Sequence, residues 1–204
     1  MSEWCALLAG LIVLIGAPFY LRDILRGHTR PERTTWLIWS VLAVIAFVSQ
    51  LKLGARWSLV YVGLTALGGL TVYLLSLKYG TDGWKGGDKI ALVIAGVGIA
   101  LALAMRSPEM AIFGVMIADF AGAVLTIQKA YRRPGSETTV TWVLAGVAWL
   151  LTTLSVGSRR FDLVMYPLYM AAICFAVPVA QAFGRLRLAA RRRLGARSIN
   201  LDAE

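Results

Sequence analysis

The sequence is poor in the residues on which most soluble enzyme sites depend. It contains two cysteines and a single histidine in 204 residues. Cys5 and Cys174 both lie in apolar runs, which excludes a disulfide framework and predicts two small core residues. His28 alone cannot supply the several ligands that a zinc site needs. The sequence also lacks a glycine-rich phosphate loop and a Ser–His pairing, so it predicts neither a metal site nor a cofactor.

Charged residues are scarce as well. They make up 16% of the chain, against 58% hydrophobic residues, whereas about 25% of an ordinary soluble domain is charged. A membrane-spanning helix needs about 20 apolar residues, and its backbone polar groups must be paired within the helix. Seven apolar runs meet or approach this length, so we expect an all-α integral membrane protein with seven transmembrane helices. The runs are residues 4–20, 35–53, 58–77, 90–105, 110–128, 138–156 and 163–183.

Acidic residues are outnumbered by basic ones, 11 to 21. Cytoplasmic loops collect Lys and Arg, and most of these residues fall in alternate connections, beginning with the first. We therefore expect an N-terminus outside and a C-terminus in the cytoplasm, in a membrane of the bacterial inner (plasma) type. The first run lacks a positive leading segment and a clear cleavage site, which indicates a retained helix. The basic tail, residues 185–204, is predicted to bind anionic lipids and not nucleic acid.

The chain contains an internal repeat with an offset of 103 residues. Such a repeat is typical of duplicated helical units, and here both copies begin on the same side of the membrane, which makes them parallel. We expect two three-helix bundles, residues 1–80 and 109–184, joined by a loop and linker helix at 81–108. The most informative matches are Arg30-Pro31 with Arg133-Pro134, Thr35 with Thr138, Trp39 with Trp142 and Gly54-x-Arg56 with Gly157-x-Arg159.

This 3 + 1 + 3 layout resembles the SWEET sugar facilitators and the wider PQ-loop transporter group. Those families carry a Pro-Gln pair, or a similar one, near the cytoplasmic end of the first helix of each bundle. Here Pro18-Phe19 and Ala121-Gly122 stand at these positions. The resemblance implies that Pro18 is a hinge for gating. It also implies that the third helix of each bundle lines a central pocket, which makes candidates of Thr71, Tyr73, Tyr169 and Cys174.

Other candidate residues follow from the helices themselves. Asp119 lies mid-span, where an ionisable group is costly and usually faces a cavity or a partner; the alternative is a neutral acid bonded to a backbone carbonyl. Trp39 and Trp142 are either interfacial anchors or pocket walls, and Trp149 suits either a flat ligand or core packing. Small residues at four-residue spacing on the same helix as Asp119 predict a close helix contact. They are Gly114, Ala118 and Gly122.

Pro167 and Pro178 interrupt the backbone hydrogen bonding of the last run and predict bending points for gating. Taken together, these features favour a transporter or facilitator of a small polar or aromatic metabolite, working by alternating access between the two bundles. The alternative is a membrane-embedded enzyme, such as an integral terpene cyclase, with Asp119 as its acid. A passive scaffold and a homo-oligomer also remain open.

Overall fold

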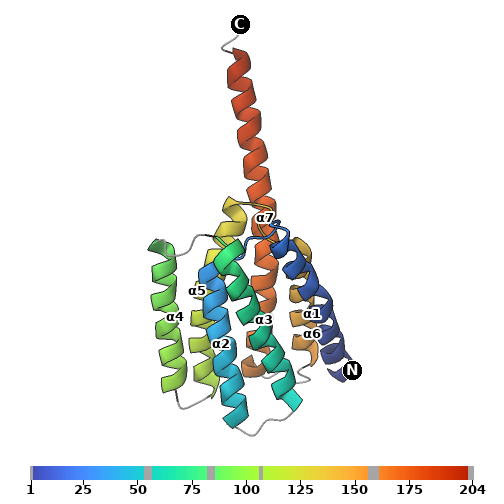
Figure 1. Cartoon of the computed structure of the whole chain (residues 1–204), viewed down its shortest axis with the longest axis vertical. Helices are drawn as coiled ribbons and strands as arrows, with labels where there is room; N and C mark the ends of the chain where they lie inside the picture. Colours follow the sequence, from blue (N-terminus) through green and yellow to red (C-terminus); the bar gives the residue numbers. More distant parts are fainter. Residues whose placement is uncertain (1, 53–56, 82–85, 106–107, 156–160, 202–204) are drawn as a thin grey trace.

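The chain folds into a bundle of long helices (Figure 1). A computed structural model of the protein describes residues 2–52, 57–81, 86–105, 108–155 and 161–201. These residues contain seven helices and no strand, which confirms the all-α prediction for the described part of the chain. The helices are α1 (Ser2–Leu25), α2 (Arg33–Lys52), α3 (Trp57–Tyr79), α4 (Gly86–Ala104), α5 (Pro108–Arg132), α6 (Thr139–Ser155) and α7 (Phe161–Leu201).

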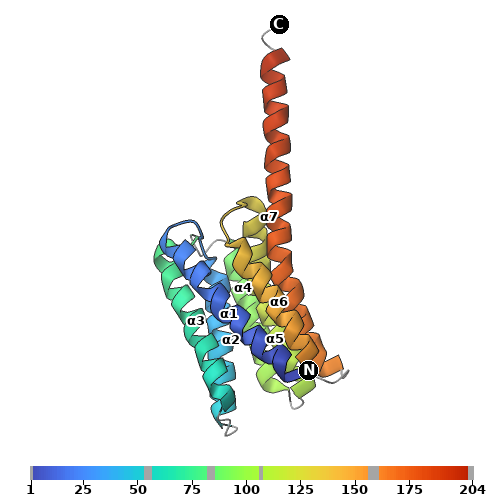
Figure 2. The same cartoon turned by 90° about the vertical axis from the view of Figure 1, so that its right-hand side faces the viewer.

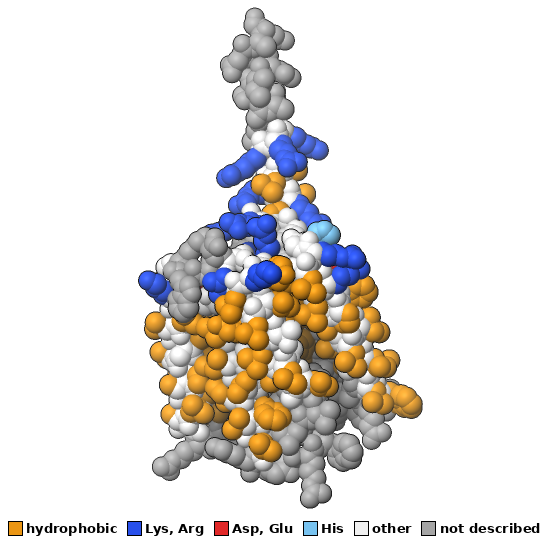
Figure 3. All heavy atoms as spheres, viewed as in Figure 1, with side chains coloured by type: hydrophobic (Ala, Val, Ile, Leu, Met, Phe, Trp, Pro, Cys, Tyr) orange, Lys and Arg blue, Asp and Glu red, His pale blue; other side chains and the backbone are white. Residues whose placement is uncertain are grey.

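The outside of this bundle suits lipid. Large apolar side chains are exposed along the helices, and Lys and Arg gather at the end from which α7 extends (Figure 3). Four helices have segments long and apolar enough to cross a membrane: Leu7–Leu25, Gly86–Ala104, Met110–Arg132 and Val164–Arg193. Two further apolar segments, Arg33–Ser49 and Thr139–Ser155, are shorter. The helices therefore indicate a membrane protein, while the count of seven spans stays a prediction.

The helices pair in a regular pattern. Extensive packing joins α1 to α6, α2 to α3, α4 to α5, α5 to α7 and α6 to α7, whereas α1 touches α3 only slightly. Figure 2 shows α1 running along the second half of the chain and apart from most of α3. A smaller contact joins α2 to α5. The first helix thus packs mainly on the predicted second bundle, so the two halves are interleaved where they meet.

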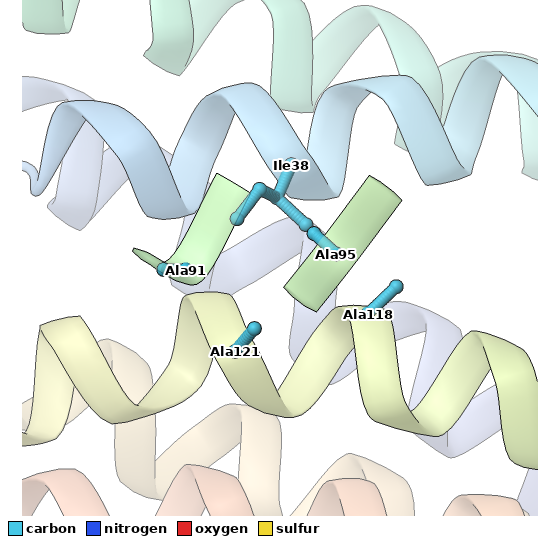
Figure 4. Close-up of a cluster of buried hydrophobic side chains, with 5 residues drawn as sticks. All are labelled: Ile38, Ala91, Ala95, Ala118 and Ala121. Atoms are coloured by element: carbon cyan, nitrogen blue, oxygen red, sulfur yellow. The ribbon is translucent and has the colours of Figure 1, made fainter. Parts of the chain in front are cut away.

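The predicted close contact of the small residues on α5 is confirmed, and α4 is its main partner. A Cβ atom added to Gly98 would lie 2.6 Å from the carbonyl oxygen of Gly114 and 2.7 Å from the amide nitrogen of Ala118. Gly122 instead faces α2, at Thr35 and Trp39. Ile38 of α2 completes this interface with four alanines of α4 and α5, which are Ala91, Ala95, Ala118 and Ala121 (Figure 4).

The last helix is longer than the apolar run that predicts it. It continues through Pro167 and Pro178 and extends past the bundle as far as Leu201 (Figures 1 and 2). Proline is tolerated inside a helix where neighbouring helices support it, and Pro167 is buried. The basic tail is therefore helical as far as Leu201, and residues 202–204 lie outside the described part.

The contact between α4 and α5 gives a stability test. We expect Gly98→Ala to destabilise the protein by about 1–3 kcal/mol, because its methyl group would meet backbone atoms that cannot move aside. Gly96→Ala on the same helix is the matched control, since nothing lies within 4 Å of its added Cβ atom. Equilibrium unfolding in detergent micelles measures both variants. Equal stability of the two variants would contradict the close contact.

Candidate functional site

A cavity of about 300 Å³ lies among five helices, with walls from both predicted bundles. Nearly all of its surface is apolar. It brings together four of the predicted site residues: Trp39, Trp142, Thr71 and Cys174. The full lining consists of Ile12, Val13, Gly16, Ala17, Tyr20 and Leu21 of α1; Trp36 and Trp39 of α2; Gly68, Thr71 and Val72 of α3; Thr141, Trp142, Leu144 and Ala145 of α6; and Met170, Ile173 and Cys174 of α7.

Four aromatic side chains of the lining form a closed circuit, which we call the aromatic box: Tyr20, Trp36, Trp39 and Trp142. Successive ring centroids around the box are 5.5, 5.3, 5.9 and 6.4 Å apart. Tilted and edge-to-face arrangements at these distances are favourable for aromatic pairs. The repeat-related Trp39 and Trp142 thus meet at 5.9 Å, and both line the cavity.

The polar groups of the box differ in how they are satisfied. Trp142 Nε1 donates to Glu137 at 2.9 Å, and the Tyr20 hydroxyl donates to the same carboxylate oxygen at 2.8 Å. Trp39 Nε1 donates weakly to the backbone carbonyl of Asp119 at 3.4 Å. Trp36 Nε1 is buried and lies beside the Tyr20 hydroxyl. A ligand in the cavity would therefore meet an almost wholly apolar and aromatic lining.

A buried ion pair lies directly behind the box. Glu137 accepts from the Lys129 ammonium group, and the side chains of the two residues are 0% and 7% exposed. Lys129 also donates to the backbone carbonyl of Arg30, while Gln181 donates to the backbone carbonyl of Glu137. A buried charge needs this degree of pairing, because removing it from water costs several kcal/mol. The pair thereby links α5, α6, α7 and the loop after α1.

Sequence reasoning missed this network. Glu137 and Lys129 stand at the ends of apolar runs, where charged residues are normally solvated, but contacts from α1, α6, α7 and the loop after α1 bury them here. Gln181 was missed for the same reason. The one available signal was that Glu137 immediately precedes an apolar run, where an acidic residue favours a helix N-terminus.

Two threonines at equivalent repeat positions make matching contacts. Thr35 of α2 accepts from Thr126 of α5 at 3.0 Å. Thr138, just before α6, donates to Asp23 of α1, also at 3.0 Å. An offset of 103 relates Thr35 to Thr138 and Asp23 to Thr126. The same polar contact is thus formed twice, once in each direction between the two halves of the chain.

Asp119 is placed behind the cavity wall and does not line it. The residue is 3% exposed, and its carboxylate accepts a hydrogen bond from the Tyr169 hydroxyl at 2.7 Å. The ring of Tyr166 packs against Tyr169 on one side and Trp149 on the other, with centroid distances of 6.3 and 5.9 Å. Asp119, Tyr169 and Trp149 therefore form a second polar and aromatic cluster, separate from the cavity lining.

The remaining candidates are dispersed. Tyr73 is half-buried on α3 and does not line the cavity. The Thr71 hydroxyl bonds back to the carbonyl of Leu67 on its own helix, which leaves its methyl group as the main contact surface. Pro18 is exposed on α1, next to the lining residue Ala17. In the part of the chain that the structure describes, no group of three or more His, Cys, Asp or Glu residues could hold a metal ion.

The ion pair behind the box makes a quantitative prediction. Glu137→Gln should destabilise the protein by about 3–5 kcal/mol, because it leaves the Lys129 charge buried without its partner. Adding Lys129→Met should restore much of the loss. Equilibrium unfolding in detergent micelles measures this cycle, with Arg22→Gln as the control, since Arg22 belongs to an exposed ion pair worth about 0–1 kcal/mol. Strictly additive losses would show that the two charges are not coupled.

The comparisons with known proteins add no identification. No protein-family model matches the chain, and no curated protein or solved structure matches it significantly. The resemblance to the SWEET and PQ-loop transporters therefore stays a prediction, and the function has to be inferred from the site itself.

Proposed function

We propose that the protein transports a small, flat metabolite with aromatic character through the cavity between its two halves. The aromatic box carries this proposal. It combines residues from α1, α2 and α6, so its ligand would contact both predicted bundles at once. A ligand held in this way would be released when the bundles move apart, which is the geometry that alternating access requires.

The cavity also supports a class of cargo. Its volume of about 300 Å³ corresponds to the lower end of the range for small-molecule sites. Rings at 5.3 to 6.4 Å from one another offer faces and edges for stacking. These features favour an aromatic metabolite with few polar groups over a sugar, whose many hydroxyls would find almost no partners.

The interleaved contacts support movement of one half against the other. The related contacts of α1 with α6 and of α2 with α5 suit two parallel units around an axis along the membrane normal. Tyr20 of the first unit meets Glu137 of the second, so the network behind the box would close the basic end of the cavity. Pro18, Pro167 and Pro178 would supply bending points in α1 and α7.

The proposed topology follows the charge pattern. With the basic end in the cytoplasm, the seven helices would span a bacterial inner membrane with the N-terminus outside, and the cavity would be closed toward the cytoplasm. The basic extension of α7 would then start in the headgroup region, where the arginines nearest the bundle would meet anionic lipids. This topology places both proposed bundles in the same orientation.

A membrane-embedded cyclase is supported less well. Aromatic faces around an apolar cavity would stabilise a carbocation, as such an enzyme requires. Its acid must also reach the substrate, yet no aspartate or glutamate is found among the residues that line the described cavity. Asp119 and Glu137 both point their carboxylates at protein donors behind the wall. Transport needs no such acid, so it is the function that this cavity fits better.

Uptake into proteoliposomes tests the proposal. A panel of radiolabelled aromatic metabolites should include at least one that the wild type takes up, and Trp39→Leu should reduce that uptake about tenfold by removing a ring from the box. Trp4→Leu is the matched control, because Trp4 is 71% exposed and lies outside the cavity lining. Equal loss in both variants, or conversion of a panel compound without uptake, would contradict transport through this cavity.

Asp119 gives a separate test of how the wall is held. We infer that its carboxylate positions Tyr169 and does not contact the cargo. Asp119→Asn keeps an acceptor oxygen for the Tyr169 hydroxyl, so it should retain uptake with an unchanged KM. Asp119→Leu loses that acceptor and should reduce uptake and thermal stability together. If Asp119→Asn abolished uptake while remaining as stable as the wild type, the charge of Asp119 would belong to the transport mechanism.

A further inference from the structure

A second cavity, of about 330 Å³, lies at the basic end of the bundle. It opens between the loop after α1 and the loop after α5, and α7 contributes one side chain to it. No aspartate or glutamate belongs to this part of the described surface. The lining consists of His28, Arg30, Arg132, Arg133, Pro134, Gly135, Ser136 and Leu188.

The two loops are held together by their backbones. The amide of Arg30 donates to the carbonyl of Ser136 at 3.0 Å. The carbonyl of Arg30 accepts a hydrogen bond from the Lys129 ammonium group, which also forms an ion pair with Glu137. Gly135 adopts a φ of +100°, a left-handed conformation that suits glycine at this turn. Both backbone polar groups of Arg30 are therefore anchored in the second half, the amide to the opposite loop and the carbonyl to α5.

The charges in this cavity are not neutralised by the protein. The ion pairs found within the described residues are Arg22 with Asp23 and Lys129 with Glu137, and none of the arginines of the cavity takes part in them. The Ser136 hydroxyl is buried and has no hydrogen-bond partner among the residues that the structure describes. Three arginines, a histidine and a serine thus line one depression, where an anion would supply acceptors for the arginines.

The internal repeat explains why the arginines meet here. Arg30-Pro31 and Arg133-Pro134 are equivalent at the 103-residue offset, and the fold brings both arginines to one cavity. Two copies of the same residue that line one depression, one from each half of the chain, suit a ligand that bridges them. The two arginines of the repeated Arg-Pro pair are therefore candidates for binding one ligand together.

We propose that this cavity binds a phosphate group, which bridges the loop after α1 and the loop after α5. Guanidinium groups present paired N–H donors that match phosphate oxygens, and such charge-assisted bonds are the stronger class of hydrogen bonds. The group would belong either to a lipid headgroup or to a soluble phosphate, since the site lies where apolar side chains give way to basic ones (Figure 3). It is distinct from the basic extension of α7, which contributes only Leu188.

Binding of inorganic phosphate to the full-length protein in detergent tests the site. Isothermal titration at constant ionic strength should detect phosphate binding, and Arg30→Gln/Arg133→Gln should weaken it by about tenfold or more. Ser136→Ala should weaken it less. Arg191→Gln/Arg192→Gln removes the same charge from exposed positions outside the cavity and should leave the affinity unchanged. Equal weakening in both double variants, or no saturable binding by the wild type, would overturn the proposal.

Two further measurements distinguish the source of the phosphate and guard against misfolding. Phosphatidic acid in phosphatidylcholine nanodiscs should displace inorganic phosphate and be retained in native mass spectra if a lipid headgroup fills the site. If phosphate binding persists beside that lipid, the ligand is soluble. In the absence of phosphate, wild type and Arg30→Gln/Arg133→Gln should unfold at the same midpoint. If the double variant is less stable, Arg30→Lys/Arg133→Lys is used in its place, and it must weaken phosphate binding while remaining folded. Because no step measures uptake, the result is independent of the proposed transport.

Discussion

The arrangement of this protein depends on one buried carboxylate. Glu137 holds Lys129 by charge, accepts hydrogen bonds from Tyr20 and Trp142, and is itself held through its backbone carbonyl by Gln181. A fully buried charge is stable only when its hydrogen-bonding capacity is filled. Four structural elements therefore have to meet at this point, and the aromatic box is formed on the cavity side of that meeting.

The same residues connect the two proposed sites. On one side, Glu137 orients two rings of the aromatic box. On the other side, Lys129 donates both to Glu137 and to the carbonyl of Arg30, a residue that lines the basic cavity. A phosphate bound to Arg30 and a cargo bound against Tyr20 would therefore act on a common set of contacts. Each ligand would favour the arrangement in which the basic end is closed, and linkage requires such an influence to be mutual.

Much of the helical fold could be predicted from the sequence, because helix formation in lipid follows from apolar runs alone. The candidates Trp39, Trp142, Thr71 and Cys174 line one cavity, while their role in binding a cargo stays a prediction. Which face of a helix lines a cavity depends on packing, which a run of uniformly apolar residues does not encode. Asp119 consequently lies behind the wall with Tyr169 and Trp149, Tyr73 lies elsewhere on α3, and the burial of Glu137 and Lys129 had no clear counterpart in the sequence.

The division of these contacts between the two halves indicates what opening the basic end would cost. Glu137 and Lys129 both belong to the second half, so their ion pair would move as one body and need not break. At the basic end, this network crosses to the first half through hydrogen bonds, at Tyr20, at Asp23 and at both backbone polar groups of Arg30. A hydrogen bond of this kind contributes about 0.5–1.5 kcal/mol, or roughly twice that to a charged group. Opening the basic end would therefore break these hydrogen bonds but leave the buried ion pair of Glu137 with Lys129 intact, which avoids the larger cost of separating two buried charges.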